Sequence, residues 1–279
     1  FPAVRAVLVS EKKEWKMKRC DLFSFVRLSL KVAAVCMCLF LAAGCSDDEV
    51  SSSVSPRKIP SSKRAAPPGP VISLEQYDGG FFTIDRPRGW EVIPAGQCSS
   101  FAFLIRDPQE HRRQIFHFGE VGPLYMDQRQ KQIDMQYMQM GGYPVQYIEM
   151  PVVNPLTPSN FFAQFHLIAR TRIAQSFMPQ CPRLEGFSVI STTPQPCPIN
   201  GGMTELVRAV FVQNGKTAEG LFAATVAPVL PMTGSPGGGI AYAFLVAGIT
   251  APHGEFAQIQ KELTRSIGSY TLSQDYANR

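Results

Sequence analysis

The chain has 279 residues, of which 27 are Lys or Arg and 22 are Asp or Glu, so its formal net charge is +5. The excess lies in residues 1–44, which hold eight basic and three acidic residues, whereas residues 45–279 hold 19 of each. Because residues 45–279 are neutral overall, they have no general attraction for phosphate backbones, and a nucleic-acid-binding function is not expected.

Residues 17–44 have the order of a secretory signal peptide, with a basic start, a short apolar run and small residues before a cut site. The apolar run, residues 32–41, is too short for a transmembrane helix. It is followed by Ala43, Gly44 and Cys45, and this order resembles the lipobox of bacterial lipoproteins, in which the cysteine carries lipid. The resemblance implies a lipid attached to Cys45 and a membrane-anchored location in the cell envelope, at the outer membrane in a Gram-negative host.

The segments on either side of the signal have distinct expected roles. Residues 1–16 are expected to be an upstream extension, with translation starting at Met17. Residues 45–70 comprise the lipidated cysteine and a linker rich in Ser, Pro and Lys, which has too few large apolar residues to fold. Residues 71–279 are long enough to form a single globular domain.

The first half of this domain predicts several short strands and one helix. Apolar or aromatic runs bounded by Gly, Pro or Asp are typical of strands. They cover residues 81–84, 101–106, 114–119 and 145–150. A helix is predicted over residues 126–140, because Ile133, Tyr137 and Met140 share one face and Gly141 marks the end.

A second helix and a hairpin follow. Thr157 and Pro158 are a favourable N-cap and first helical residue. The broad apolar face of this helix carries Phe161, Phe162, Phe165, Ile168 and Ala169. Residues 206–212 and 217–227 predict two strands joined by Asn214-Gly215, a pair that favours a type I′ turn.

The last part of the chain predicts a loop, a strand and a helix. Residues 234–239 form a glycine-rich loop that lacks the Lys-Ser/Thr pair of phosphate-binding loops. Residues 240–249 predict a buried strand, and residues 254–267 predict a helix with apolar residues at helical spacing. Together the elements predict an α+β domain with a mostly antiparallel sheet covered by helices.

The two ends of the domain resemble those of PsbP-like domains. Residues 82–92 contain the opening strand and a Pro-x-Gly-Trp turn at Pro87–Trp90, and the close is a helix running into Ile267-Gly268-Ser269-Tyr270. The resemblance implies binding or scaffolding rather than catalysis. It also implies that the two ends meet, which would bury Trp90 against the C-terminal helix.

Three cysteines lie within the predicted domain. Because export permits disulfides, Cys181 and Cys197 are expected to form a bridge, although all three thiols could instead be reduced and buried. Cys98 is then the odd thiol, or the partner in an alternative bridge.

Cys98 also defines the enzymatic alternative. Gly96-Gln97-Cys98-Ser99 superficially resembles the nucleophile of cysteine proteases, and His111, His117 and His166 are available partners, so the alternative function is an envelope hydrolase using Cys98 or a histidine. The local signatures of such proteases are absent, and a buried thiol is the favoured interpretation.

The remaining alternative is a metal carrier. His117 could bind a metal with Glu120 and His166, or the methionines could bind copper, but no ligand spacing supports a site. His117 is therefore expected to be a half-buried structural residue facing opposite to its two phenylalanine neighbours. Core packing is expected for Met126 and Met140, and exposure for Met135 and Met138.

The function expected from the sequence is a lipid-anchored envelope lipoprotein that acts as a binding module and is not an enzyme. Its expected partners are the membrane, through the lipid on Cys45, and another envelope protein. No cofactor and no metal are expected.

Overall fold

The computed structural model describes residues 70–231, 238–273 and 276. The expected signal peptide, the lipid site Cys45 and the linker up to residue 69 lie outside these ranges, as do residues 234–237 of the glycine-rich loop. The chain divides into two units, 1–70 and 71–279, and every element below belongs to the second.

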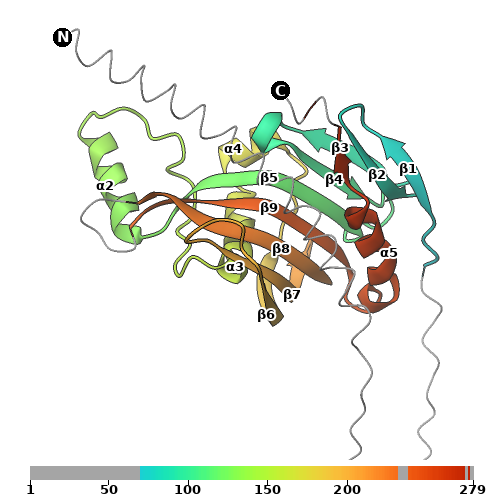
Figure 1. The fold of residues 1–279 in the computed structure, drawn as a ribbon. Helices are drawn as coiled ribbons and strands as arrows, with labels where there is room; N and C mark the ends of the chain where they lie inside the picture. Colours follow the sequence, from blue (N-terminus) through green and yellow to red (C-terminus); the bar gives the residue numbers. More distant parts are fainter. Residues whose placement is uncertain (1–69, 232–237, 274–275, 277–279) are drawn as a thin grey trace, which may run out of the picture. The chain divides into compact units, whose positions relative to one another are not determined.

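Two antiparallel sheets form this unit (Figure 1). Their strands are β1 (Leu74–Asp78), β2 (Phe82–Pro87), β3 (Glu91–Ala95), β4 (Ala102–Arg106), β5 (Gln114–Tyr125), β6 (Glu185–Gln195), β7 (Met203–Gln213), β8 (Lys216–Pro231), β9 (Gly239–Pro252) and β10 (Thr271–Leu272). The smaller sheet has the order β1-β2-β10, and the larger has the order β3-β4-β5-β9-β8-β7-β6. All these pairings are antiparallel, which confirms the predicted α+β class with a mostly antiparallel sheet.

The helices are α2 (Gln128–Gln139), α3 (Pro158–Ile168), α4 (Arg172–Phe177) and α5 (Phe256–Gly268), with a short 3₁₀ helix, η2, at Cys98–Ser100. Each α-helix lies within or close to a predicted one except α4, which is new. Among the described residues, no helix is both long and apolar enough to cross a bilayer.

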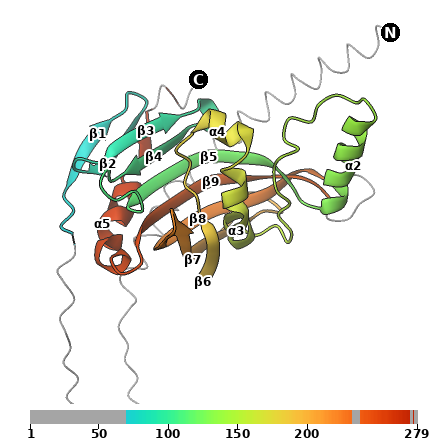
Figure 2. The same cartoon turned by 180° about the vertical axis from the view of Figure 1, so that it is seen from behind.

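One face of the larger sheet packs against α3, which contacts β6, β7 and β8 (Figure 2). The helix begins as predicted, because the Thr157 hydroxyl accepts a hydrogen bond from the backbone N–H of Asn160. Its phenylalanines are fully buried, and Phe165 stacks on Phe116 of the sheet while Phe162 packs against Phe222. This aromatic layer is the main core of the domain.

The opposite face of the larger sheet packs against α5, which also contacts β2 of the smaller sheet. Phe256, Ile259 and Leu263 of α5 are buried, as their helical spacing predicts. The central strands of the larger sheet are therefore buried on both faces.

The two ends of the unit meet, as the sequence predicts. β10 pairs with β2 at Thr271–Thr83 and Leu272–Phe82, and the backbone N–H of Asp85 donates to the Ser269 hydroxyl over 2.7 Å. Trp90 is buried as predicted. Its contact with α5 stays a prediction.

The predicted hairpin is confirmed by β7 and β8, whose turn has Asn214 at φ 51° and Gly215 at φ 73°. The strand predicted over residues 145–150 is wrong. The N–H of Ile148 donates to the Val145 carbonyl and that of Met150 to the Tyr147 carbonyl, so local turn bonds replace strand pairing there.

Candidate binding surface

The structure separates the residues considered for catalysis. The expectation of a buried thiol at Cys98 is wrong, because Cys98 is exposed at the start of η2, where its backbone N–H donates to the Tyr276 hydroxyl over 2.6 Å. His166 lies on α3, where its Nδ1 contacts the Ala163 carbonyl, and His111 lies in the β4–β5 turn. None of the described hydrogen bonds joins a histidine to Cys98.

His117 is more deeply buried than the sequence predicts. It faces opposite to Phe116 and Phe118, as expected, but it is only 7% exposed. Its ring packs 5.5 Å from Phe103 and 5.0 Å from Tyr270, measured between ring centroids. Burial lowers its pKa from 6.5 to about 4, so the imidazole is neutral.

The residues of the metal hypothesis do not form a site, although His117 and Glu120 both lie on β5. His117 packs against Phe103 and Tyr270, whereas Glu120 accepts a hydrogen bond from the Ser99 hydroxyl over 3.0 Å and His166 lies on α3. In the part of the chain that the structure describes, no group of three or more metal-ligating side chains gathers.

The expected disulfide between Cys181 and Cys197 is absent, and both residues are free thiols. They flank the two ends of β6, an eleven-residue strand. An extended strand of this length spans roughly 30 Å, whereas a disulfide requires Cα atoms within about 7 Å. The loop that the bridge was expected to close is therefore a strand, which keeps the two thiols apart.

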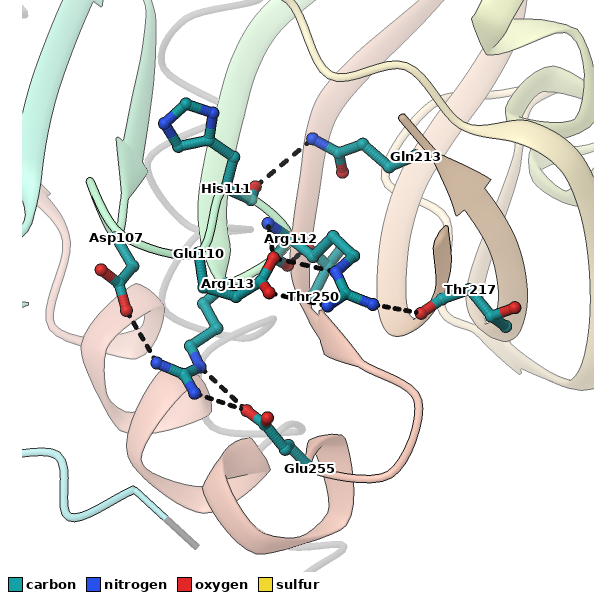
Figure 3. A network of polar contacts seen from close by, with 9 residues as sticks. All are labelled: Asp107, Glu110, His111, Arg112, Arg113, Gln213, Thr217, Thr250 and Glu255. Atoms are coloured by element: carbon teal, nitrogen blue, oxygen red, sulfur yellow. Dashed lines mark hydrogen bonds and ion pairs between the residues drawn. The ribbon is translucent and has the colours of Figure 1, made fainter. Parts of the chain in front are cut away.

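Charged side chains at one end of the larger sheet are paired with one another (Figure 3). Arg113 joins Asp107, at 2.9 Å, to Glu255 at the start of α5, at 2.8 Å. Arg112 lies 2.6 Å from Glu110, and its guanidinium holds the pKa of that carboxyl down at about 2. The network ties the β4–β5 turn to α5.

Sequence reasoning did not single out Glu219. This buried carboxylate accepts from the Arg208 guanidinium at 2.6 Å and contacts Nδ1 of exposed His253 at 2.9 Å. Alternating positions on β7 and β8 bring Arg208 and Glu219 to one face of the sheet, which only the strand register reveals. Both carboxylate oxygens are occupied, so we interpret the cluster as a structural tie between β7, β8 and the β9–α5 turn.

Among the described helices, α2 leaves a stripe of three apolar side chains in solvent. It begins at Asp127, whose side chain accepts from the backbone N–H of Arg129. Gly141, at φ 87°, ends it, and a Cβ at Gly142 would lie 2.5 Å from the ring of Tyr137. Glycine at both positions therefore lets the chain turn tightly under that ring.

The face of α2 turned toward the domain is polar. Asp134 accepts from the Tyr125 hydroxyl at 2.8 Å and from the Gln130 side chain at 2.8 Å. Lys131 donates to the Met150 carbonyl at 2.7 Å and lies over the Tyr125 ring. Tyr125 is fully buried, and its burial, with the bond to Asp134, raises its pKa. These hydrogen bonds fix the orientation of α2 on the domain.

The apolar side chains of α2 point away from these contacts. Ile133, Tyr137 and Met140, at positions i, i+4 and i+7, are 39%, 46% and 80% exposed and form what we call the outer stripe. The prediction that Met140 packs in the core is wrong, while Met126 is half-buried against the core. Met135 is exposed as expected, but Met138, also expected to be exposed, is half-buried. The helical periodicity correctly identifies the residues of the stripe, but the stripe faces solvent and not the core of the domain.

Comparisons with known proteins give no family. No protein-family profile and no curated protein matches the chain. Solved structures that it resembles include cyanobacterial PsbP (CyanoP) from Synechocystis sp. PCC 6803, with a TM-score of 0.31 and 8% identity over 73% of this chain and 95% of that one.

Two further solved structures are similar at the same level. LpqN, involved in cell envelope biogenesis of Mycobacterium tuberculosis, has a TM-score of 0.28 and 13% identity over 72% of this chain and 91% of that one. PA94 of Pseudomonas aeruginosa, a protein of unknown function, has a TM-score of 0.23 and 7% identity over 71% of this chain and 94% of that one. At these TM-scores the three matches carry no argument about function.

Proposed function

We propose that this protein is a lipid-anchored module of the cell envelope that binds another envelope protein through the outer stripe of α2. The observation that carries the proposal is the orientation of the helix. Its polar side chains are used for contacts within the domain, and Ile133, Tyr137 and Met140 are left in solvent. A surface helix normally turns such a stripe toward its own core.

The spacing of the stripe fits recognition of a helix in a groove. Anchors at i, i+4 and i+7 are typical of an amphipathic helix that lies in an apolar groove of its partner. The twelve residues of α2 span about 18 Å. We therefore infer that the partner offers an uncharged groove of about this length.

A lipid surface is a poorer fit for α2. Helices that lie in the membrane interface carry Lys and Arg on their polar face. The flanks of the outer stripe are mainly glutamines, and Lys131 is used inside the domain. The chain also enters the domain at β1, which lies at the other end of the larger sheet from α2 (Figure 1).

A second copy is also a poorer occupant of the outer stripe. Two helices of about 18 Å meeting side by side would bury well under the roughly 1,200 Å² of stable interfaces. A groove encloses the helix on more than one side and so buries more of it.

The contact is tested by placing a photo-cross-linking amino acid at Met140 in cells that express the full chain. The expected product is one adduct with an envelope protein, mapped by mass spectrometry to an apolar groove of that protein. The same probe at Met135, which lies on another side of α2, should not give it. Adducts with lipid or with a second copy would contradict the proposal.

A matched pair of charge substitutions completes this test. Ile133→Asp should abolish the adduct, because a carboxylate cannot enter an apolar groove without losing its hydration. Gln132→Asp puts the same charge next to the stripe and should preserve it. Equal loss in both variants, or no loss in either, would overturn the proposed contact.

The anchor is tested separately. In Cys45→Ser the lipid site is absent, so the protein should leave the membrane fraction or stay uncleaved. A variant that is processed normally and remains bound through acyl chains would contradict lipidation at Cys45 and leave the α2 contact unaffected.

A further inference from the structure

β6 ends the larger sheet, and its outer side is open. Among the described residues, no strand pairs with β6 on the side away from β7 (Figure 1). The strand has eleven residues and is mostly exposed on both faces, with Val189 and Ile190 at 43% and 53%. Its outward N–H and C=O groups are therefore available to another strand.

The composition of β6 does not discourage pairing. No charged residue occurs from Gly186 to Thr204, and β-branched residues follow one another at positions 189, 190, 192 and 193. Proteins usually protect an edge strand with charged side chains, above all lysine.

The other edge of the same sheet is protected. β3 has only five residues, it contains Pro94, which has no N–H to donate, and its Glu91 is paired with Arg106 at 3.0 Å. One edge of the sheet is therefore closed to pairing, and the other is open.

We propose that the protein forms a two-fold dimer in which β6 of one copy pairs antiparallel with β6 of a second copy. Antiparallel pairing about a two-fold axis is self-complementary, because each copy offers the same donors and acceptors. An uncharged strand can meet its own copy without like-charge repulsion. A strongly charged partner peptide would find no complementary charge on β6.

The protected edge at β3 limits assembly through the larger sheet to two copies, because β6 is the one open edge of that sheet among the described strands and the two-fold contact closes on itself. Pairing is also restricted within β6. The register with β7 shifts between Glu185 and Ser188 and between Val189 and Ser191, and Pro194 lacks an N–H. Such features reduce the number of consecutive backbone hydrogen bonds that β6 can form with a second strand. We therefore expect a weak dimer that dissociates reversibly. This proposal does not depend on the outer stripe of α2.

The dimer is tested by disulfide cross-linking of the full chain in cells. Single cysteines are placed in turn at positions 188 to 193, in a background with Cys98→Ser and Cys197→Ser. Disulfide-linked dimers should form at some of these positions and not at others, because side chains alternate between the faces of a strand. Val92→Cys on β3 is the control and should give no dimer.

The cysteine variant that gives the most cross-linked dimer then receives one of two lysine substitutions. Both substitutions replace an apolar residue, and the two residues are exposed to a similar extent. Ile190→Lys should remove the dimer band, because it places two like charges near the axis. Leu230→Lys, on β8 and 50% exposed, should preserve it. The proposal would be overturned if no position of β6 gave a dimer, or if Val92→Cys on β3 gave as much dimer as the β6 positions. Survival of the dimer band with Ile190→Lys would also overturn it.

Discussion

His117 is a titratable side chain whose ionisation is controlled by burial alone. Its ring packs against both Phe103 and Tyr270, and desolvation is the cause of its lowered pKa. The Tyr270 hydroxyl beside it is buried and has no hydrogen-bond partner among the described residues. An imidazolium at this site would have neither water nor an anion to stabilise it.

This burial predicts a loss of stability on acidification. The folded pKa is about 4 and the ordinary value is 6.5, so between these values the unfolded chain binds more protons than the folded one. The contribution of neutral His117 to the free energy of unfolding should therefore be fully present above pH 6.5. It should fall by about 3 kcal/mol as the pH is lowered to 4. Urea denaturation at intervals across this range measures it.

The variant His117→Phe isolates the effect, because it keeps an aromatic ring in the core and removes the titration. Its stability should change less than that of the wild type between pH 6.5 and 4. Glu110 acts in a lower range, since its pKa is about 2 and its contribution is lost as the pH falls from 4.5 toward 2. Identical slopes for the two proteins between pH 6.5 and 4 would contradict the assignment.

At the scale of elements, Arg113 should stabilise the domain through the tie that it makes between the β4–β5 turn and α5. Its side chain is 21% exposed and bonds to Asp107 and Glu255. Arg113→Met leaves both carboxylates without their partner, and we expect a loss of about 1–3 kcal/mol in the free energy of unfolding.

Arg172 is the matched control for this tie. It lies 2.6 Å from Glu149, as close as any pair in the network, but its side chain is 89% exposed. Solvent screens such a pair, so Arg172→Met should cost well under about 1 kcal/mol. Equal losses in the two variants, measured by chemical denaturation, would show that burial does not decide the value of these ion pairs.

The elements that the sequence predicts correctly are those determined by local chemistry. Thr157-Pro158 starts α3, and Asn214-Gly215 turns the β7–β8 hairpin, because caps and turns need only neighbouring residues. β6 was not predicted, since its Ser and Thr residues lack the usual apolar alternation. Its neighbour β7 supplies the pairing that makes it a strand.

The candidate site was predicted only in part, because the position of a face depends on the rest of the fold. The spacing of Ile133, Tyr137 and Met140 correctly predicts a helix with an apolar stripe. The direction of that stripe is set by Tyr125 and Met150, which bind the opposite face through Asp134 and Lys131. No local pattern in the sequence reports these distant partners.

At the scale of the whole molecule, the first and last elements of the described domain close it together. Phe82 of β2 is fully buried, and its ring lies 5.4 Å from Phe103 of the larger sheet and 6.2 Å from Tyr270 after α5. One side chain therefore joins the smaller sheet, the larger sheet and the C-terminal segment. Loss of this ring should affect the whole domain, not only its N-terminal edge.

Phe82→Ala should cost on the order of 3–5 kcal/mol, the usual loss for a buried phenylalanine. For a domain of this size the corresponding fall in Tm is about 10 °C, with a single unfolding transition. Its neighbour Phe81 is the control, because it is only half-buried and stacks on Tyr276 at the surface. Phe81→Ala should lower Tm by much less. If Phe82→Ala instead produced an early partial transition while the rest of the domain melted at its original temperature, the smaller sheet would be an independent unit and the two ends would not close the domain.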